Sequence, residues 1–244
     1  MLLTYFNLAK PRILLLVVVT ALASATVAGQ GAVRLSTIGL LALAGGLASI
    51  GAAFLNNYFD RDIDGIMPRT QHRPLPEGKV NPDRVLLVGL VLIAISMPVA
   101  LRINYVTALF ILTGALIYVA LYTLWLKRRT SLNIVFGGLS GSSAALAGWF
   151  AVTSQPSIIT VMIALLLFLW TPSHFWSFAL VHHESYRQAS IPMLPVLAGA
   201  KKTSVLILLS TCLLVLVSLL LYFLGSFREV YLVGSVILGA IFLG

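Results

Sequence analysis

The sequence has few charged residues and very few acids. Lysine and arginine number 16 and aspartate and glutamate number 7, which together make 9% of the 244 residues, whereas 59% are apolar. Soluble globular domains carry about 25% charged residues, so this composition excludes that class and indicates an integral membrane protein. In such a protein the net charge of +9 belongs to loops that orient the spans and does not indicate a nucleic-acid partner.

Cysteine is almost absent as well. The single cysteine, Cys212, lies inside an apolar run. This excludes a disulfide framework, a CxxC redox motif and a cysteine zinc site. We expect Cys212 to behave as a small apolar side chain within a span.

Long apolar runs are the dominant feature, and eight of them can cross about 30 Å of hydrocarbon. The eight predicted spans are residues 13–29, 35–58, 85–101, 104–125, 132–152, 157–180, 204–224 and 229–244. Because unpaired backbone groups are costly in lipid, we predict an all-α polytopic membrane helical bundle, one domain over residues 1–244. The last run reaches the final residue without a polar tail, so two interpretations stay open, an unusually bare final span or a C-terminal truncation.

The loop cations alternate between two sides of the predicted bundle. The N-terminal segment and every second loop hold thirteen lysines and arginines, and the other loops hold three. Cytoplasmic loops carry the excess of positive residues, so we predict that the N-terminus and the thirteen-cation side are cytoplasmic. Six of the seven acids lie on this same side, which predicts that the polar chemistry is gathered there.

The end of the second run carries three oxygen side chains at a regular spacing. Asn56, Asp60 and Asp64 stand four residues apart, so on a helix they form one stripe. The two carboxylates repel each other unless a cation is present, and Mg²⁺ takes oxygen ligands together with substrate phosphates. We therefore predict a magnesium and phosphate site here. The calcium-loop alternative fails because its twelfth position is Gln71 in place of a bidentate Glu.

Basic residues follow this stripe in a proline-rich loop. Arg69, Arg73 and Lys79 suit a polyanion held beside the carboxylates, and we predict that they bind diphosphate. Lys127 ends the fourth run, one turn below Tyr122. It has two open interpretations, a phosphate ligand or part of a charged anchor with Arg128 and Arg129.

An aromatic segment lies inside the sixth run. Pro172 is expected to kink this span, and Trp170 and Trp176 flank His174. Ionisable residues within a span are candidates for function. We predict that His174 and the two tryptophans contact a large planar substrate.

Several motifs in order along the chain resemble the UbiA superfamily of membrane prenyltransferases, and within it the protohaem IX farnesyltransferases (haem O synthases). The motifs are Ala9-Lys10-Pro11-Arg12, the Asn56, Asp60, Asp64 stripe with Arg69-Thr70 and Arg73 to Val80, Tyr122-Thr123 through Asn133, Gly148-Trp149, Trp170 to Trp176, and Ile191 to Val196. The chain departs from the family's second polar motif, where Glu184 is its only carboxylate.

The resemblance implies a nine-helix fold, of which a ninth span is missing here. It implies that Mg²⁺ bridges Asn56, Asp60 and Asp64 to farnesyl diphosphate, with Glu184 as a second-motif metal ligand. It implies farnesyl transfer to a vinyl group of haem B in the inner cell membrane, with haem A synthase or a terminal oxidase as assembly partners. Two alternatives stay open: another acceptor, either a quinone-precursor ring or a lipid glycerol phosphate, and, more remotely, an ion-coupled transporter.

Overall fold

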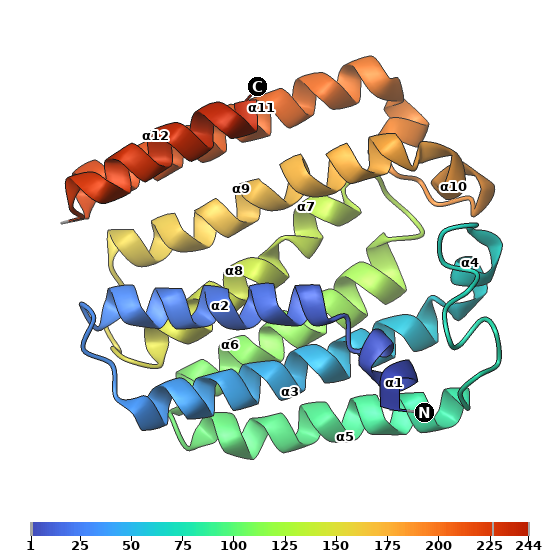
Figure 1. Ribbon diagram of the computed structural model, residues 1–244, viewed down its shortest axis with the longest axis horizontal. Coiled ribbons are helices and arrows are strands. Elements are labelled where there is room, and N and C mark those ends of the chain that lie inside the picture. Colours follow the sequence, from blue (N-terminus) through green and yellow to red (C-terminus); the bar gives the residue numbers. More distant parts are fainter. Residues whose placement is uncertain (1, 226, 244) are drawn as a thin grey trace.

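The computed structural model describes residues 2–225 and 227–243, and these contain helices and no strands (Figure 1). The long elements are α2 (Pro11–Ala28), α3 (Leu35–Phe59), α5 (Pro82–Leu101), α6 (Tyr105–Leu116) continued by the π-helix η1 (Ile117–Leu126), α9 (Ile158–Val181) and α11 (Leu194–Leu224). The shorter ones are α1 (Leu2–Leu8), α4 (Arg61–Ile66), α7 (Asn133–Gly137), α8 (Leu139–Phe150), α10 (His183–Gln188) and α12 (Glu229–Leu243).

Six of the eight predicted spans coincide with helices that are long and apolar enough to cross a membrane in the part of the chain that the structure describes. The run 132–152 is instead divided at Gly138 into α7 and α8. A Cβ at Gly138 would lie 3.1 Å from Thr171 Cβ on α9, so the break sits at a close contact between helices. The run 229–244 forms α12, which has 15 residues. The predicted all-α multi-span membrane bundle is confirmed.

One predicted boundary differs from the structure. The helix that contains the span expected at 204–224 starts at Leu194, but Gly199, with φ 78° and ψ 168°, breaks it with a kink. The continuous helix after the kink begins four residues before the predicted boundary and includes Lys201 and Lys202. The prediction left these two residues out of the span because they are charged.

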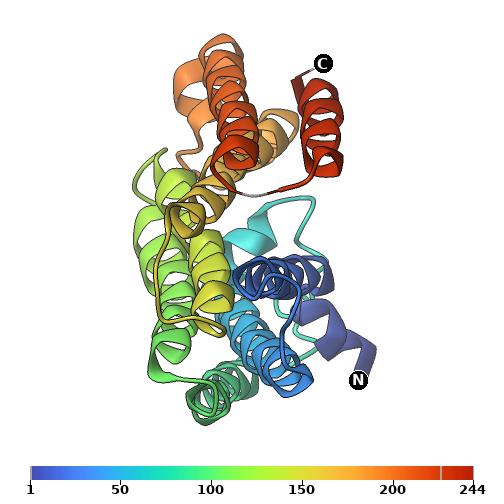
Figure 2. The same cartoon turned by 90° about the vertical axis from the view of Figure 1, so that its left-hand side faces the viewer.

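Small residues bring neighbouring helices close together. A Cβ at Gly148 of α8 would lie 1.9 Å from the carbonyl oxygen of Ala21 on α2, and one at Gly51 of α3 would lie 2.6 Å from that of Gly89 on α5. Such contacts let helix backbones pack tightly where lipid supplies no hydrophobic driving force between helices. Figure 2, which turns the molecule by 90°, shows the dark-blue α2 and the red α12 on the same side of the bundle.

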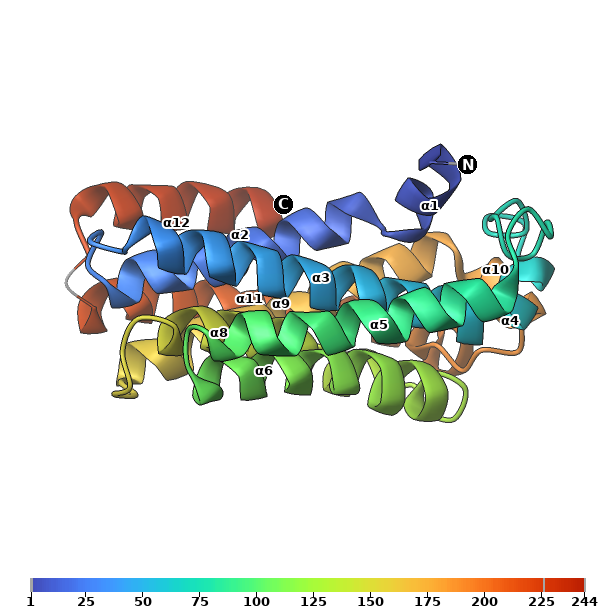
Figure 3. The same cartoon turned by 90° about the horizontal axis from the view of Figure 1, so that it is seen from below.

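The polar connections gather at one end of the bundle. Figures 1 and 3 place α1, α4, α10 and the loop between α4 and α5 together, away from the short connections that follow α2, α5 and α8. At the opposite end, Asn104 caps α6 by accepting from Thr107 N at 2.8 Å, and its Nδ2 donates to Phe150 O at 2.7 Å. The sequence prediction that the cation-rich loops share one side therefore agrees with the arrangement of the helices.

Candidate functional site

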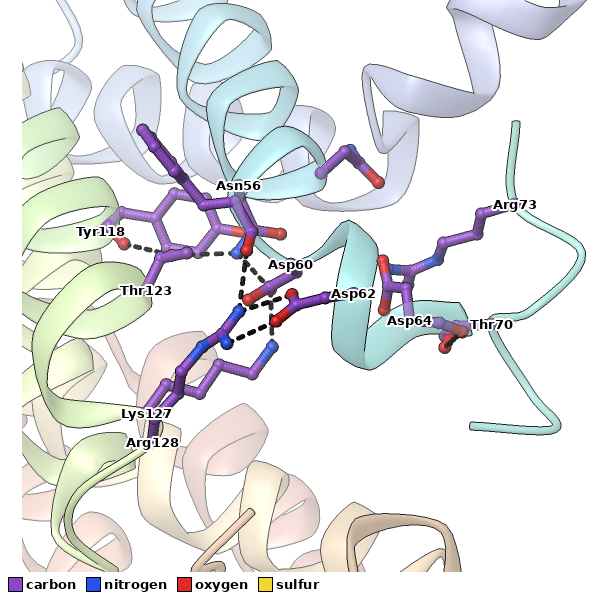
Figure 4. A network of polar contacts seen from close by, with 12 residues as sticks. Asn56, Asp60, Asp62, Asp64, Thr70, Arg73, Tyr118, Thr123, Lys127 and Arg128 are labelled. Carbon is purple, nitrogen blue, oxygen red and sulfur yellow. Dashed lines mark hydrogen bonds and ion pairs between the residues drawn. The ribbon is translucent and has the colours of Figure 1, made fainter. Parts of the chain in front are cut away.

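The acidic stripe lies where α3 ends and α4 begins. Asp60 N donates to Asn56 O at 2.9 Å and Asp64 N donates to Asp60 O at 2.8 Å, so helical spacing continues through the junction. The exposed fractions of Asn56, Asp60 and Asp64 are 2%, 1% and 2%. The three predicted ligands therefore lie in one buried row (Figure 4).

Cations from the end of η1 and from the loop after α4 neutralise the two buried carboxylates. Lys127 Nζ lies 2.6 Å from Asp60 Oδ2, and Arg73 Nη1 lies 2.6 Å from Asp64 Oδ2. Because an uncompensated buried charge is strongly destabilising, these pairs stabilise the buried row. They also favour the first interpretation of Lys127, since its side chain points into the site (Figure 4).

The amide of Asn56 is held from both sides. Its Nδ2 donates to Asp60 Oδ2 and to Thr123 Oγ1, each at 2.9 Å, and its Oδ1 accepts from Lys10 Nζ. Asp60 Oδ1 is buried and has no hydrogen-bond partner among the described residues. The row thus contains one carboxylate oxygen that is desolvated and unsatisfied.

The π-helix η1 explains how Tyr118, Thr123 and Lys127 face the row together. At the α-helical angle of about 100° per residue, Tyr118 and Lys127 would point to opposite sides. A π-helix advances by roughly 80° per residue and returns them to one face. The wider turn is visible in the bond from Lys127 N to Tyr122 O at 2.8 Å, five residues back.

Lys10 belongs to the site although the sequence analysis noted it only as a loop cation and part of a motif. It precedes α2 with a left-handed backbone, φ 50°, and it donates to Asn56 and, at 3.3 Å, to the Tyr118 hydroxyl. Burial lowers the pKa of Lys10 to about 8, although Asp60 and Asp64 act to raise it. The sequence feature that could have identified Lys10 is its position immediately before Pro11, at the start of a span.

Asp62 lies off the row and forms a separate pair. Arg128 Nη1 and Nη2 lie 2.6 and 2.7 Å from its two carboxylate oxygens, and Nη2 also donates to Phe59 O at 2.8 Å. The hydrogen bonds from Arg128 lower the pKa of Asp62 to about 2. Arg128, interpreted from the sequence as an anchor charge, thus ties the end of η1 to the junction of α3 and α4.

Three predicted ligands are not brought to the row by any contact in the described structure. Glu184 is exposed on α10 and pairs with Arg187 at 2.7 Å, and Lys79 pairs with Glu77 in the loop. Arg69 instead lies over the ring of Phe178, 5.0 Å from its centroid. Among the described residues, no three His, Cys, Asp or Glu side chains form a metal-ligand group.

The predicted aromatic residues of α9 point in two directions. Trp170 stacks on His174 with ring centroids 4.6 Å apart and planes 10° from parallel, and His174 is exposed. Trp176 is 6% exposed and packs in a core with Met67 and Tyr186. Its place in that core differs from the substrate wall that the sequence predicted for both tryptophans.

An apolar cleft begins beside the row. Lys10 and Tyr118 stand at one end, and the walls that follow come from α2, α3, α6 and α8, with small residues such as Gly45, Ala52 and Ala144. The cleft is partly open to the surroundings, and its cavity volume is about 100 Å³. Its lining of apolar and small side chains suits the apolar part of a ligand.

Comparison with known proteins identifies the family. Residues 17–244 match the UbiA prenyltransferase family. The chain belongs to this family. The family resemblance expected from the motifs is therefore confirmed, and the chain is a multi-pass membrane enzyme of the prenyltransferase class.

Curated relatives in the UbiA family are similar over nearly the whole chain. The Protoheme IX farnesyltransferase of Symbiobacterium thermophilum is 44% identical over 238 residues, which cover 96% of this chain and 79% of that protein. Protoheme IX farnesyltransferase 1 of Paramagnetospirillum magneticum is also 44% identical, covering 98% of this chain and 85% of the relative.

Solved structures of UbiA proteins share the fold. A UbiA homolog from Archaeoglobus fulgidus bound to DMAPP and Mg²⁺ superposes with a TM-score of 0.81 at 19% identity, covering 98% of this chain and 84% of that one. A digeranylgeranylglyceryl phosphate synthase superposes with a TM-score of 0.80 at 21% identity, covering 99% and 85%. At these identities the likeness concerns the fold alone.

Proposed function

We propose that this enzyme transfers a farnesyl group from farnesyl diphosphate to a vinyl group of haem B, giving haem O and diphosphate. The observation that carries the proposal is the buried row of Asn56, Asp60 and Asp64, surrounded by cations at the mouth of an apolar cleft. The similarity to curated farnesyltransferases over 96–98% of the chain supports haem as the acceptor.

A divalent cation fits the row, and we propose Mg²⁺. The donors are hard oxygens of Asn56, Asp60 and Asp64, and Asp60 Oδ1 is buried without a partner, as expected of an atom that a metal ion would satisfy. A relative of the same fold is bound to DMAPP and Mg²⁺. When bound, the cation would stabilise the negative charge that develops on the leaving diphosphate.

The cations of the row are proposed to bind the diphosphate. Arg73 and Lys127 contact the two carboxylates, and Lys10 contacts Asn56. All three cations would therefore lie next to the phosphate oxygens of a diphosphate bound at the row. Arginine presents a fork to two oxygens, and lysine presents a point charge. Together they would neutralise the leaving group as the ester bond breaks.

The cleft is proposed to hold the farnesyl chain. Its polar end is formed by Lys10 and Tyr118 and the remainder by apolar and small side chains. This orientation places the diphosphate at the row and the hydrocarbon among α2, α3, α6 and α8. Exclusion of water there would protect the allylic carbon from hydrolysis.

The proposed reaction is a substitution at that allylic carbon. The carbon–oxygen bond breaks and its electron pair leaves with diphosphate. The electron pair of the vinyl group forms the new carbon–carbon bond, and water adds to the resulting cation with loss of a proton. His174 and Trp170, stacked on α9, are proposed to contact the haem ring.

We also propose the cellular setting. The cation-rich end of the bundle is proposed to face the cytoplasm across the cell (inner) membrane, because positive residues favour that side. We propose haem A synthase or a terminal oxidase as an assembly partner, since each would use haem O or a haem made from it.

Product identification tests the proposal. Membranes containing the protein, supplied with haem B, farnesyl diphosphate and Mg²⁺, should accumulate haem O, detected by its mass, and membranes with the Asp64→Asn variant should not. Prenylation of an aromatic acid or of a lipid glycerol phosphate in place of haem would move the assignment to another acceptor. Substrate flux across vesicles without a covalent product would support a transporter.

A further inference from the structure

A row of rings follows one face of α9. Trp170, His174, Phe178 and His182 stand four residues apart, and the pairs at its two ends are in contact, Trp170 with His174 at 4.6 Å and Phe178 with His182 at 4.4 Å between centroids. At about 100° per residue this spacing keeps the rings on a slowly turning stripe. We call these four residues the α9 ring face.

Part of the surface of α9 is covered by protein. Ser173 Oγ lies 2.7 Å from Ser210 Oγ on α11, and Thr171 packs on Gly138 at the break between α7 and α8. Trp176 is buried in a core with residues of α7 and α11. His174, in contrast, is exposed, and the other three ring-face residues are partly exposed, so the ring face is open to a ligand.

Arg69 lies over this ring face in a fixed position. Its guanidinium carbon is 5.0 Å from the centroid of Phe178. The residues on either side are anchored: Met67 is buried in the core, and Thr70 Oγ1 donates to Asp64 O at 2.9 Å. The Tyr186 hydroxyl lies beside the Arg69 guanidinium as well, and the five N–H donors of an arginine leave others for a further acceptor.

Arg69 differs from Arg73 and Lys127 in having no acidic partner. Arg73 pairs with Asp64 and Lys127 pairs with Asp60, whereas no ion pair joins Arg69 to a carboxylate in the described part of the chain. The next residue, Thr70, donates to the backbone oxygen of Asp64, and the Arg69 guanidinium itself lies over Phe178. Arg69 therefore stands between the acidic row and the α9 ring face.

We propose that Arg69 binds a carboxylate side chain of the haem acceptor, while the haem ring lies along the α9 ring face. This assignment rests on the proposed function and removes Arg69 from the predicted diphosphate ligands. Haem combines a flat apolar ring with two carboxylates at one edge. The ring face supplies flat apolar contacts, and Arg69 at its end supplies the complementary positive charge. Carboxylates bind well to the arginine fork.

Esterified haem separates the carboxylate contact from every other effect of Arg69. The purified full-length protein is titrated with haem B and with haem B dimethyl ester, without farnesyl diphosphate, and the Soret absorbance is followed. We expect Arg69→Gln to weaken binding of haem B on the order of tenfold, the effect of a lost charge-assisted hydrogen bond. Binding of the dimethyl ester should be the same in the variant and the wild type.

Steady-state kinetics with Arg73→Gln as the matched control complete the test. Arg69→Gln should raise KM for haem and leave KM for farnesyl diphosphate unchanged, whereas Arg73→Gln should do the reverse. The inference is overturned if Arg69→Gln raises KM for farnesyl diphosphate alone, or if it weakens binding of haem and its ester equally.

A second variant keeps the inference testable if Arg69→Gln folds poorly. Phe178→Leu retains an apolar side chain but removes the ring beneath Arg69, and it should weaken haem B binding more than ester binding. Equal weakening would contradict the carboxylate contact. Wild-type protein that binds haem but forms no haem O would instead defeat the proposed function, because the titration does not depend on turnover.

Discussion

The two polar motifs at the cation-rich end of the bundle are built in opposite ways. In the first, Asp60 and Asp64 are buried and their cationic partners come from other elements, Lys127 being 67 residues away from Asp60. In the second, Glu184 is exposed and pairs with Arg187, three residues away on the same short helix. Buried, long-range pairing indicates a site assembled by the fold, whereas a local exposed pair indicates a solvated helix surface.

Neutralising one acid of the first motif should have the largest effect. Asp64→Asn keeps the size of the side chain but removes the charge proposed to hold the metal and to bind Arg73, so we expect turnover to fall about a hundredfold or more. Haem O formation by membranes at saturating Mg²⁺ measures this. The matched control is Asp62→Asn, since Asp62 lies off the row; equal losses in both variants would contradict the special role of the row.

Removing divalent metal should reproduce that loss reversibly. Treatment with a chelator is expected to abolish haem O formation, and added Mg²⁺ is expected to restore it, because the hard oxygens of the row suit that ion. Binding of haem alone should persist in the chelated enzyme. Full turnover after exhaustive chelation would remove the metal from the proposal.

Breaking a buried pair should cost more stability than breaking an exposed one at the next residue. Lys127→Met leaves the carboxylate of Asp60 buried without its cation, a change that destabilises by about 3–5 kcal/mol. Arg128→Met breaks a pair whose side chains are 37% and 59% exposed and should cost about 0–1 kcal/mol. The two losses of stability are compared by measuring the unfolding temperature of each variant in detergent.

A double variant tells whether the loss comes from the uncompensated charge. Combining Lys127→Met with Asp60→Asn should recover much of the unfolding temperature without recovering activity. If the double variant is as unstable as Lys127→Met alone, the loss reflects packing of the lysine side chain and not the carboxylate.

The row itself was predictable from sequence because it depends on local helical spacing. Backbone hydrogen bonds from Asp60 to Asn56 and from Asp64 to Asp60 continue the helical spacing. The four-residue spacing alone therefore indicates that the three side chains lie on one face. Six of the eight predicted spans were predictable for a similar reason, since span length is set by membrane thickness.

The partners of the row were not predictable, because they depend on how distant helices meet. No periodicity in Tyr118 to Lys127 indicates a π-helix, yet that geometry turns Lys127 toward Asp60. Arg69 and Arg73 are the same residue type four positions apart, and only the path of the loop sends one to Phe178 and the other to Asp64. Because the path of the loop cannot be read from the sequence, both arginines were predicted to bind diphosphate.

Loosening the amide of the row should have a moderate effect. Thr123 Oγ1 accepts from Asn56 Nδ2 and donates to Tyr118 O at 2.7 Å, which directs Asn56 Oδ1 toward Lys10. Thr123→Val keeps the shape but removes both bonds, so we expect kcat to fall about tenfold, in line with the loss of one buried hydrogen bond. The matched control is Thr26→Val, whose hydroxyl donates only to Leu22 O within α2. Similar kinetics in both variants would reduce Thr123 to a packing role.

Glu184→Gln should have the smallest effect, and it tests the contrast most directly. Arg187 lowers the pKa of the exposed Glu184 carboxyl, so Glu184 is charged at neutral pH, but an exposed pair contributes little to stability. We expect haem O formation to stay within about threefold of the wild type, with no change in the Mg²⁺ concentration needed for half-maximal rate. A loss as deep as that of Asp64→Asn, together with a raised Mg²⁺ requirement, would restore Glu184 as the metal ligand that the sequence predicted.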